Sequence, residues 1–365
     1  MAAGMLLGAC GSTKEQEATD QLDARLAELF PADKPGAAVL VMRGDSVLFD
    51  RGYGLADMET KAPIDGNTFF NIASVSKQFT AVAILQLANE GKLSIENPVA
   101  MYMPYPQSFW KEVRIKHLLS HSSGVPDERV GFTREERIHG TDSMSIAYMP
   151  YVKKLHFSPG TDYEYMNPTF VLCSKIIEQV SGEEFGEYMH KHIFMPAGME
   201  ETRYFDPAHE DLIPRMAHGY EYENGWQEYD YGEETFFATR GDGGIYTSTH
   251  EFVRWEAALK NSAEGSGLMV NGAWLKQAWE PRTKVSGSEW SDYQNRPNTW
   301  YGYGWFIEPA TDSTKTVIYH TGDNGGFQIL AARYPEDEGL VLVFSNRADW
   351  DRYGLMQEIE AIFGF

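Results

Sequence analysis

A serine and a lysine lie three residues apart at the start of a long apolar segment. The segment is "NIASVSKQFTAVAILQLANEGK", and the two residues are Ser74 and Lys77. From Phe79 onward the apolar positions recur with the spacing of a buried helix. Two residues three apart share a helix face, so Ser74 could act as a nucleophile with Lys77 as its base. Alternatively, Ser74 caps the helix and Lys77 extends to water. These residues alone leave both interpretations open.

The chemical interpretation sets conditions on the surroundings of both side chains. A serine hydroxyl is a weak nucleophile near neutral pH, so it needs a base. Lys77 can serve as that base only if burial or neighbouring positive charge lowers its pKa. A nucleophile at the start of a helix also lies beside backbone N–H groups that could bind an oxyanion.

A second candidate is Tyr165-Met166-Asn167, which directly precedes a long apolar helical stretch. A tyrosine near an ammonium group can relay a proton, and an asparagine amide can orient a lysine and a substrate carbonyl. The same Y-x-N spacing occurs at 222–224 and at 293–295. Neither of these precedes such a helix, so both are predicted to lie in surface loops.

A third candidate is His320-Thr321-Gly322, followed by Asp323, at the end of a predicted strand. A glycine here would let a substrate backbone approach the strand edge closely. The backbone N–H of Asp323 could supply a second oxyanion donor. The alternative is a polar hairpin with a histidine on the surface.

The elements that would hold these residues follow from periodicity and turn residues. An amphipathic helix over 20–30 and a hairpin about Arg43-Gly44-Asp45 come first. Strands from residue 301 onward and a helix over 352–363 come last. We therefore expect an α/β (α+β) fold: an antiparallel sheet flanked by helices, closed by both chain ends, with an inserted, mainly helical subdomain.

The expected domain boundaries follow from this arrangement. Residues 1–20 are expected to be a signal remnant and structureless tether, and residues 21–365 a single catalytic domain. Within that domain, the α/β part should cover about 21–95 and 236–365, with the helical insertion at about 96–235.

Composition and charge limit the classes of molecule that the protein is expected to bind. The 365 residues carry 31 Lys and Arg against 53 Asp and Glu, a net charge of −22 spread along the chain. This argues against binding to nucleic acid or to an anionic membrane surface. No group of His, Cys, Asp and Glu has metal-ligand spacing, and no dinucleotide or P-loop fingerprint occurs. We expect no metal, no cofactor, and a small-molecule or short-peptide substrate.

The two cysteines have different contexts. Cys173 lies in an apolar helical stretch and is predicted to be buried. Cys10 follows "LLGA" and precedes a polar stretch, which resembles a bacterial lipoprotein signal, although no Lys or Arg precedes the apolar run. We expect lipidation of Cys10 and a lipid-anchored, extracytoplasmic place in a bacterial envelope. The alternative is a frayed terminus with an incidental cysteine.

The three motifs in this order resemble the serine β-lactamase and penicillin-binding-protein family. That family includes class C β-lactamases, DD-carboxypeptidases, D-aminopeptidases and family VIII esterases. Three further segments are similar to its conserved stretches: "VRIKHLLSHSSGVPD" (113–127), "HIFMPAGMEETRYF" (192–205) and "GDGGIYTSTHEFVRW" (241–255). Together the resemblance covers roughly residues 25–360.

The resemblance implies a role for each matching residue. Ser74 would be acylated, Lys77 would activate it, and Tyr165 would relay protons to the leaving group. Asn167 would hold Lys77 and the substrate amide, and His320 would replace the lysine of the β-lactamases. The expected activity is a serine hydrolase acting through a Ser74 acyl-enzyme on ester or amide bonds of small substrates, such as a D-amino-acid peptide or ester. The alternatives are a β-lactamase and a penicillin-binding sensor that acylates without turnover.

Overall fold

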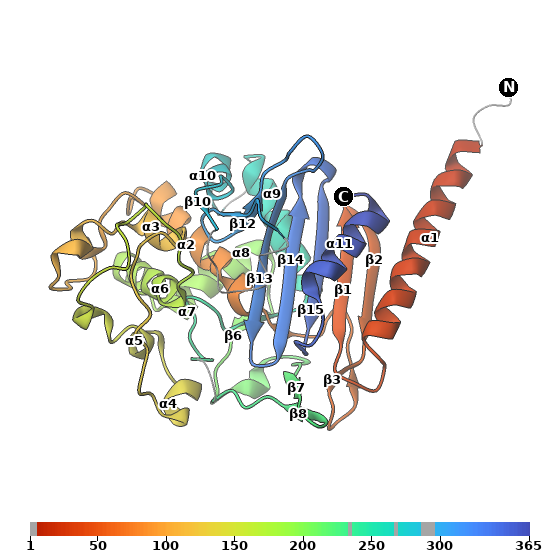
Figure 1. Ribbon diagram of the computed structural model, residues 1–365, viewed down its shortest axis with the longest axis horizontal. Helices are drawn as coiled ribbons and strands as arrows, with labels where there is room; N and C mark the ends of the chain where they lie inside the picture. Colours follow the sequence, from red (N-terminus) through yellow and green to blue (C-terminus); the bar gives the residue numbers. More distant parts are fainter. Residues whose placement is uncertain (1–5, 233–235, 266–268, 286–295) are drawn as a thin grey trace.

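The computed structural model describes residues 6–232, 236–265, 269–285 and 296–365, and the side chains from residue 14 onward. Its centre is an eight-stranded antiparallel sheet (Figure 1). The strands lie in the order β10 (Thr283–Lys284), β11 (Trp300–Tyr301), β12 (Phe306–Glu308), β13 (Val317–Asn324), β14 (Phe327–Tyr334), β15 (Gly339–Ser345), β1 (Ala37–Arg43) and β2 (Ser46–Tyr53).

The two ends of the chain meet in this sheet. β1 pairs with β15 from Ala37↔Ser345 to Arg43↔Gly339, and β1 and β2 form the hairpin predicted about Gly44. Every residue of β15 is buried, because helices cover both faces of the sheet. The predicted fold class, and the closure of the sheet by both chain ends, are confirmed.

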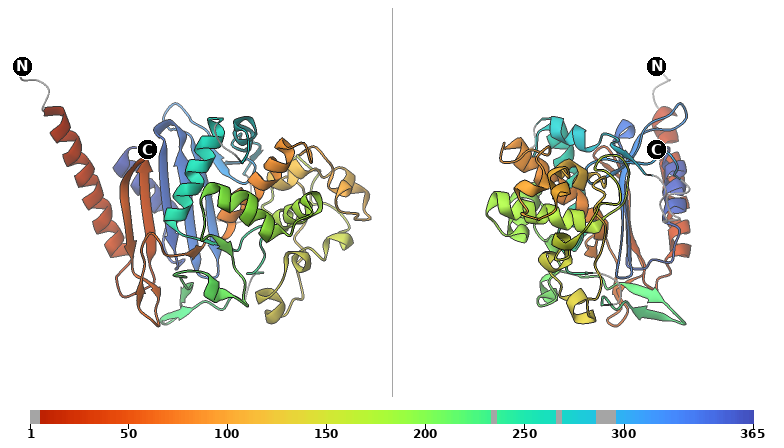
Figure 2. Two further views of the ribbon diagram at one scale, coloured as in Figure 1. Left: turned by 180° about the vertical axis from the view of Figure 1, so that it is seen from behind. Right: turned by 60° about the vertical axis from the view of Figure 1, so that its left-hand side comes forward.

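Helices form a layer on each side of the sheet (Figure 2). On one side α1 (Leu6–Leu29) and α11 (Arg352–Phe363) lie next to each other. The other side carries α2 (Lys77–Asn89), α9 (Thr249–Ala263) and α10 (Gly272–Ala278). α2 is buried around its whole circumference, as expected of a helix whose residues are apolar on all sides.

The middle of the chain is mainly short helices beside the sheet, as expected for the insertion (Figure 1). Its α-helices are α3 (Ile115–Leu119), α4 (Arg134–Ile138), α5 (Asp142–Ser145), α6 (Asn167–Ser181), α7 (Phe185–Met189) and α8 (Met195–Ala197). Single turns lie at η2 (Val99–Met101), η3 (Ser108–Lys111), η4 (Met149–Tyr151), the π-helical η5 (His190–Phe194) and η6 (Glu210–Leu212), and later at η8 (Pro335–Asp337).

Small sheets complete the fold. They are β3 (Leu55–Asp57) with β4 (Ala62–Pro63), β7 (Tyr220–Tyr222) with β8 (Trp226–Glu228), and the three strands β5 (Phe70–Asn71), β9 (Ile245–Thr247) and β6 (Arg203–Tyr204). Buried apolar side chains from the sheet, from α2 and from the helical insertion form one hydrophobic cluster. The insertion therefore packs onto the same core as the sheet.

The segment expected to be a structureless tether is helical instead. α1 begins at Leu6 and continues through residues 11–20, and in Figure 1 its N-terminal half projects beyond the sheet. The polar stretch contains no proline or glycine between Gly11 and Leu29, and Gln16 hydrogen-bonds to Asp20 one turn later at 2.8 Å. The packed turns about Leu22 and Leu26 provide a folded end from which the helix extends.

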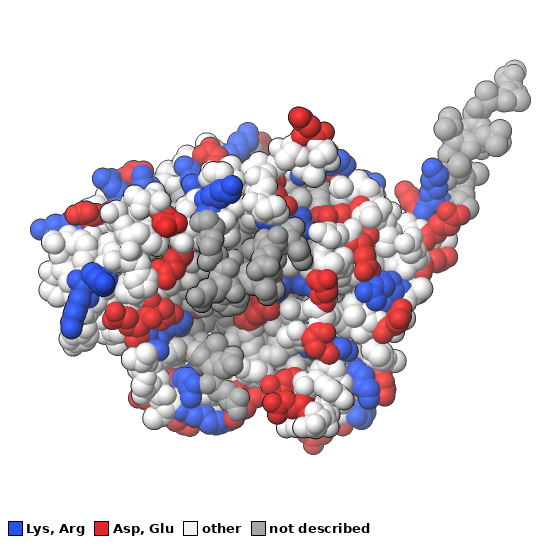
Figure 3. Space-filling view, in the orientation of Figure 1, with Lys and Arg blue, Asp and Glu red and all other residues white. Residues whose placement is uncertain are grey.

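Acidic and basic side chains are interspersed on the face shown in Figure 3, over the sheet, α11 and α1. On this face the acidic side chains are therefore not gathered in one patch. In the part of the chain that the structure describes, no helix is long and apolar enough to cross a membrane.

Candidate active site

Ser74 lies on a single 3-10 turn, η1 (Ala73–Ser76), between β5 and α2. Ala73 directly before it has φ of 47°, a left-handed conformation that is costly for a residue with a Cβ. The side chain of Asn71 stabilises this turn by accepting a hydrogen bond from the Ala73 N–H at 2.8 Å. The strained turn holds Ser74 half-buried at the wall of a cavity of about 380 Å³.

Lys77 is the first residue of α2 and is completely buried. Its Nζ lies 2.9 Å from the Oγ of Ser74 and donates to the backbone carbonyl of Asp242 at 2.8 Å. Burial lowers the pKa of Lys77 to about 7. Ser74 does not cap α2, and Lys77 does not reach water, so the interpretation of this pair as a cap and a surface lysine is wrong.

Tyr165 precedes α6, which packs against α2. Its hydroxyl lies beside the Ser74 side chain, which acts to lower the pKa of the phenol, and its ring centroid lies 5.1 Å from the Nζ of Lys77. Burial raises the pKa of Tyr165 well above its usual value, so the phenol is protonated at neutral pH. The copy at Tyr222 lies on the surface with 62% of its area exposed, as predicted, although it ends strand β7 and does not lie in a loop. The copy at 293–295 lies outside the described residues.

Asn167 opens α6 and lines the same cavity as Ser74. Its Oδ1 is buried and has no hydrogen-bond partner. Lys77 therefore does not donate a hydrogen bond to Asn167 Oδ1, although one had been expected. Its Nζ donates to the backbone carbonyl of Asp242 instead. Sequence reasoning could not find this carbonyl, because any residue type can present one.

His320 lies on β13 and is buried, with 1% of its area exposed. Its Nδ1 is 2.6 Å from the carbonyl oxygen of Thr321, and its Nε2 is 2.8 Å from the hydroxyl of Tyr301. Burial lowers the pKa of His320 to about 3, so the ring is neutral. Nδ1–H therefore donates to the carbonyl, and Nε2 accepts from Tyr301. Both ring nitrogens are thus used inside the protein, and the expected contact of His320 with substrate stays a prediction.

Gly322 brings β13 against the nucleophile turn. A Cβ at this position would lie 2.4 Å from the carbonyl oxygen of Ile72 and 3.0 Å from the Cβ of Ala73. The absence of a side chain at Gly322 therefore lets β13 pack closely against the turn that carries Ser74, whereas the sequence had predicted close approach of a substrate backbone. Thr321 is buried beside it with 6% of its area exposed. β12 pairs with β13 only as far as Tyr319, which leaves the edge beyond it facing η1.

The carboxylate of Asp323 is turned toward α11. Its Oδ2 forms an ion pair with the Nη1 of Arg352 at 2.9 Å, and Arg352 is almost completely buried. Arg352 also donates to the carbonyl of Gly322 at 3.3 Å. The negative charge of Asp323 is therefore matched by an arginine on the helix that covers the other side of the sheet.

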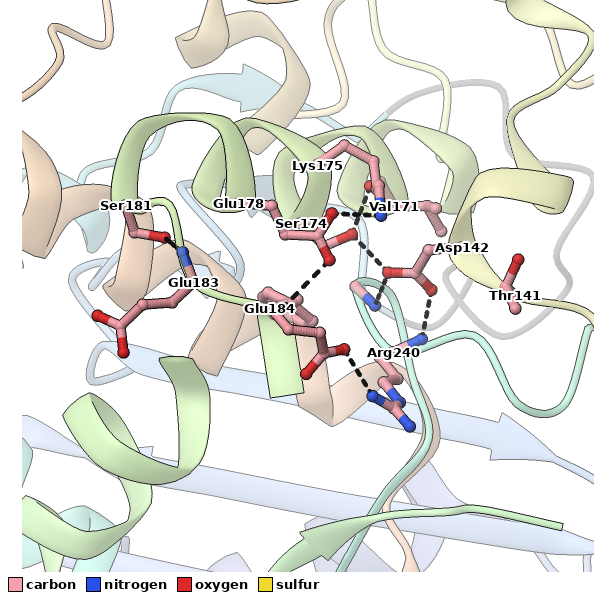
Figure 4. A network of polar contacts seen from close by, with 12 residues as sticks. Thr141, Asp142, Val171, Ser174, Lys175, Glu178, Ser181, Glu183, Glu184 and Arg240 are labelled. Atoms are coloured by element: carbon pink, nitrogen blue, oxygen red, sulfur yellow. Dashed lines mark hydrogen bonds and ion pairs between the residues drawn. The ribbon is translucent and has the colours of Figure 1, made fainter. Parts of the chain in front are cut away.

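A buried carboxylate, Asp142 of α5, holds the chain segment that ends at Asp242 (Figure 4). It accepts hydrogen bonds from the Ser174 hydroxyl at 2.5 Å and from the backbone N–H groups of Arg240 and Gly241 at 2.7 and 3.3 Å. On the other side, the Thr80 hydroxyl of α2 donates to the carbonyl of Gly241 at 2.7 Å. These bonds fix the carbonyl that orients Lys77, and no sequence motif pointed to Asp142.

His121 adjoins the site as well. Its Nδ1 accepts from the Met166 N–H at 3.1 Å, so the proton of the neutral ring is on Nε2, which has no partner. Its ring centroid lies 4.2 Å from that of Tyr165 and 4.6 Å from that of Tyr301. Burial lowers the pKa of His121 well below its usual value. Sequence reasoning missed it, although it lies in the quoted "LLSHSSGVPD" segment.

Two further expectations concern metal ligands and cysteines. Within the described ranges, no three His, Cys, Asp or Glu side chains are grouped so that they could hold a metal ion. Cys173 is buried as predicted, and burial raises the pKa of its thiol. The side chain of Cys10 lies outside the described part of the chain.

Comparisons with a family model, with relatives and with a solved structure all assign the chain to the same family. The family model described as Beta-lactamase matches residues 22–361. The chain is 28% identical over 333 residues to Penicillin-binding protein 4* of Bacillus subtilis, covering 86% of this chain and 69% of that protein. It is 24% identical to Protein flp of Staphylococcus aureus, of which it spans 59%. The crystal structure of a penicillin binding protein from Bacillus halodurans superposes with a TM-score of 0.77 at 28% identity, covering 93% of this chain and 98% of the other.

Proposed function

The chain belongs to the β-lactamase family of serine hydrolases, and on that premise we propose that it cleaves ester or amide bonds of small substrates through an acyl-enzyme on Ser74. The main support is the contact of 2.9 Å between the Oγ of Ser74 and the Nζ of Lys77, a completely buried lysine whose pKa is lowered to about 7. A lysine in this state is neutral often enough to accept the serine proton.

The reaction begins when neutral Lys77 takes the proton of the Ser74 hydroxyl and Oγ bonds to the substrate carbonyl carbon. The resulting oxyanion is stabilised by backbone N–H groups, for which the turn at Ser74 and the adjoining edge at Asp323 are the candidates. The bond to the leaving group then breaks, and Tyr165 gives its proton to that group while it takes up the proton held by Lys77, so that Lys77 is neutral again. In the second step Lys77 takes a proton from water as the water oxygen bonds to the acyl carbon. The bond to Ser74 Oγ then breaks, the proton passes to Oγ, and the acid is released.

The assignment of roles follows from the two pKa values. Burial lowers the pKa of Lys77 toward neutrality and raises that of Tyr165 far above it. At neutral pH, Lys77 can therefore accept a proton, whereas Tyr165 carries one. We infer that Lys77 is the base and that Tyr165, which lies beside Ser74, relays protons.

The test uses a panel of a chromogenic short-chain ester, a chromogenic cephalosporin and D-alanyl peptides. Ser74→Ala should abolish turnover of every substrate that the wild type cleaves, with the circular dichroism spectrum unchanged. Activity within tenfold of the wild type, in a sample free of contaminating esterase, removes Ser74 from the mechanism. A burst followed by steady turnover supports a hydrolase. Stoichiometric labelling without turnover of any ester identifies a sensor instead.

The expected substrates are D-amino-acid peptides or esters, with a β-lactam as the alternative. A neutral, internally bonded His320 does not supply the cation that a lysine would offer to a substrate carboxylate. This supports weaker binding of β-lactams and of peptides with a free carboxylate. We place the protein outside the cytoplasm, held to a bacterial envelope by lipid on Cys10, on the basis of the signal-like residues before that cysteine.

A further inference from the structure

Asp242 presents an unsatisfied carboxylate oxygen beside the nucleophile. Asp242 lines the cavity that contains Ser74, and 8% of its area is exposed. Its Oδ1 is buried without a hydrogen-bond partner, and among the described residues no ion pair includes Asp242. A buried carboxylate oxygen without a donor is costly, so the site is incomplete as it stands.

Two other charged groups around the cavity, Arg129 and Asp323, each have a partner of opposite charge. Arg129 forms a fork with Asp127, with Nε and Nη2 at 2.9 and 2.6 Å from its two oxygens. Asp323 is paired with Arg352. Lys77 lies close to Asp242, but its Nζ donates to the Asp242 backbone carbonyl and lies beside Ser74, not at the carboxylate.

The reaction itself removes the positive charge of Lys77, which acts on Asp242. Lys77 must be neutral to accept the serine proton, and in that state it no longer balances the Asp242 carboxylate. A substrate cation would then complete the site, because it would bring both a charge and N–H donors. Asn167 Oδ1, a second buried acceptor without a partner, lines the same cavity. An ammonium group has three donors and could bond to both oxygens.

We propose that the Asp242 carboxylate, together with Asn167 Oδ1, binds the free ammonium group of an α-aminoacyl substrate. This proposal rests on the proposed Ser74 hydrolase and narrows its substrate class. The Asp242 carbonyl and Ser74 Oγ lie 2.8 and 2.9 Å from the same Nζ, so Asp242 adjoins the reacting atoms. An ammonium group bound there belongs on the carbon next to the scissile carbonyl.

The experiment compares alanine p-nitroanilide, as both enantiomers, with propionyl p-nitroanilide, which has the same shape without the amino group. The measured quantity is the ratio of kcat/KM for the amine to that for the neutral anilide at pH 7. Wild type should favour the amine, and Asp242→Asn should lower the ratio about 100-fold, since a buried charge pair is lost. The control is Glu184→Gln, which removes a carboxylate that is paired with Arg240 and does not line the cavity, and it should change the ratio less than about threefold.

A ratio that is the same in Asp242→Asn and in wild type overturns this inference, while Ser74-dependent hydrolysis of the neutral anilide leaves the proposed function intact. If Asp242→Asn does not fold, inhibition of the wild type decides the question. Alaninamide should inhibit hydrolysis of a neutral ester at least about tenfold more strongly than propionamide does. Equal inhibition by the two amides also overturns the proposal.

Discussion

Lys77 sets the pH at which the proposed reaction should run. Burial lowers its pKa from 10.5 to about 7, which corresponds to about 5 kcal/mol of preference for the neutral amine. With an ordinary pKa, about one molecule in 3000 would carry a neutral Lys77 at pH 7, whereas here about half do. Since the base must be neutral, kcat/KM for a neutral ester should rise tenfold per pH unit at low pH and level off above about pH 7.

Lys77→Arg tests the same reasoning by substitution, because a guanidinium stays charged at every accessible pH. We expect kcat/KM at pH 8 to fall by about 1000-fold or more, with no rise between pH 5 and pH 9. The measurement is initial-rate hydrolysis of a chromogenic neutral ester. A wild-type rate that is flat between pH 5 and pH 9, or a Lys77→Arg variant within tenfold of wild type, would refute Lys77 as the base.

The same lowered pKa predicts how stability depends on pH. Between pH 7 and 10.5 the unfolded chain binds a proton at Lys77 that the folded protein does not, so the free energy of unfolding rises with pH by about 1.4 kcal/mol per unit from this group. Below pH 7 both states are protonated, and the full cost of the buried charge remains. Relative to Lys77→Met, wild type should therefore gain stability between pH 7 and pH 9 in denaturant titrations. A difference between the two proteins that does not change with pH contradicts this argument.

Three further predictions follow from the site and the chain start. Tyr165→Phe should lower kcat by about 100-fold or more, whereas Tyr222→Phe, a control on the exposed copy, should be close to wild type in the ester assay. Asp142→Ala should lower the free energy of unfolding by about 3 kcal/mol in a urea titration, because it leaves buried N–H groups without an acceptor; an unchanged midpoint would contradict the role of Asp142 as a clamp. Cys10 should carry lipid by mass spectrometry of the envelope fraction, and Cys10→Ser should release the protein; unmodified, soluble wild type would show that the signal-like residues are incidental.

The features predicted well from sequence are those set by local chemistry. The Arg43-Gly44-Asp45 turn between two apolar runs predicted the β1–β2 hairpin, and a helix apolar on all sides predicted the burial of α2. Serine and lysine three residues apart on a helical turn come together through backbone geometry alone, which is why their contact could be expected. Tyr165 could be chosen over its exposed copy at 222 because only the former precedes a long apolar helix.

The features predicted poorly depend on which face of an element meets a neighbour. His320 was expected to contact substrate, but its partner is Tyr301, which reaches it from the neighbouring β-strand hairpin. Gly322 was expected to make room for a substrate backbone. In the structure, the absence of a side chain at Gly322 makes room for the carbonyl oxygen of Ile72. Both contacts join residues more than a dozen positions apart, and a motif carries no information about them.

The position of Lys77 illustrates how much of a catalytic site lies outside its motifs. The Nζ is directed by a backbone carbonyl at residue 242, which is held by a carboxylate at residue 142 through the N–H groups of Arg240 and Gly241. Each hydrogen bond in this series uses a backbone group, which every residue has, or a carboxylate, which many residues have, so no sequence motif marks it. The same segment also lines the cavity with Asp242. Orientation of the base and recognition of the substrate are therefore built on one short loop, so a change that loosens Asp142 should disturb both rate and selectivity.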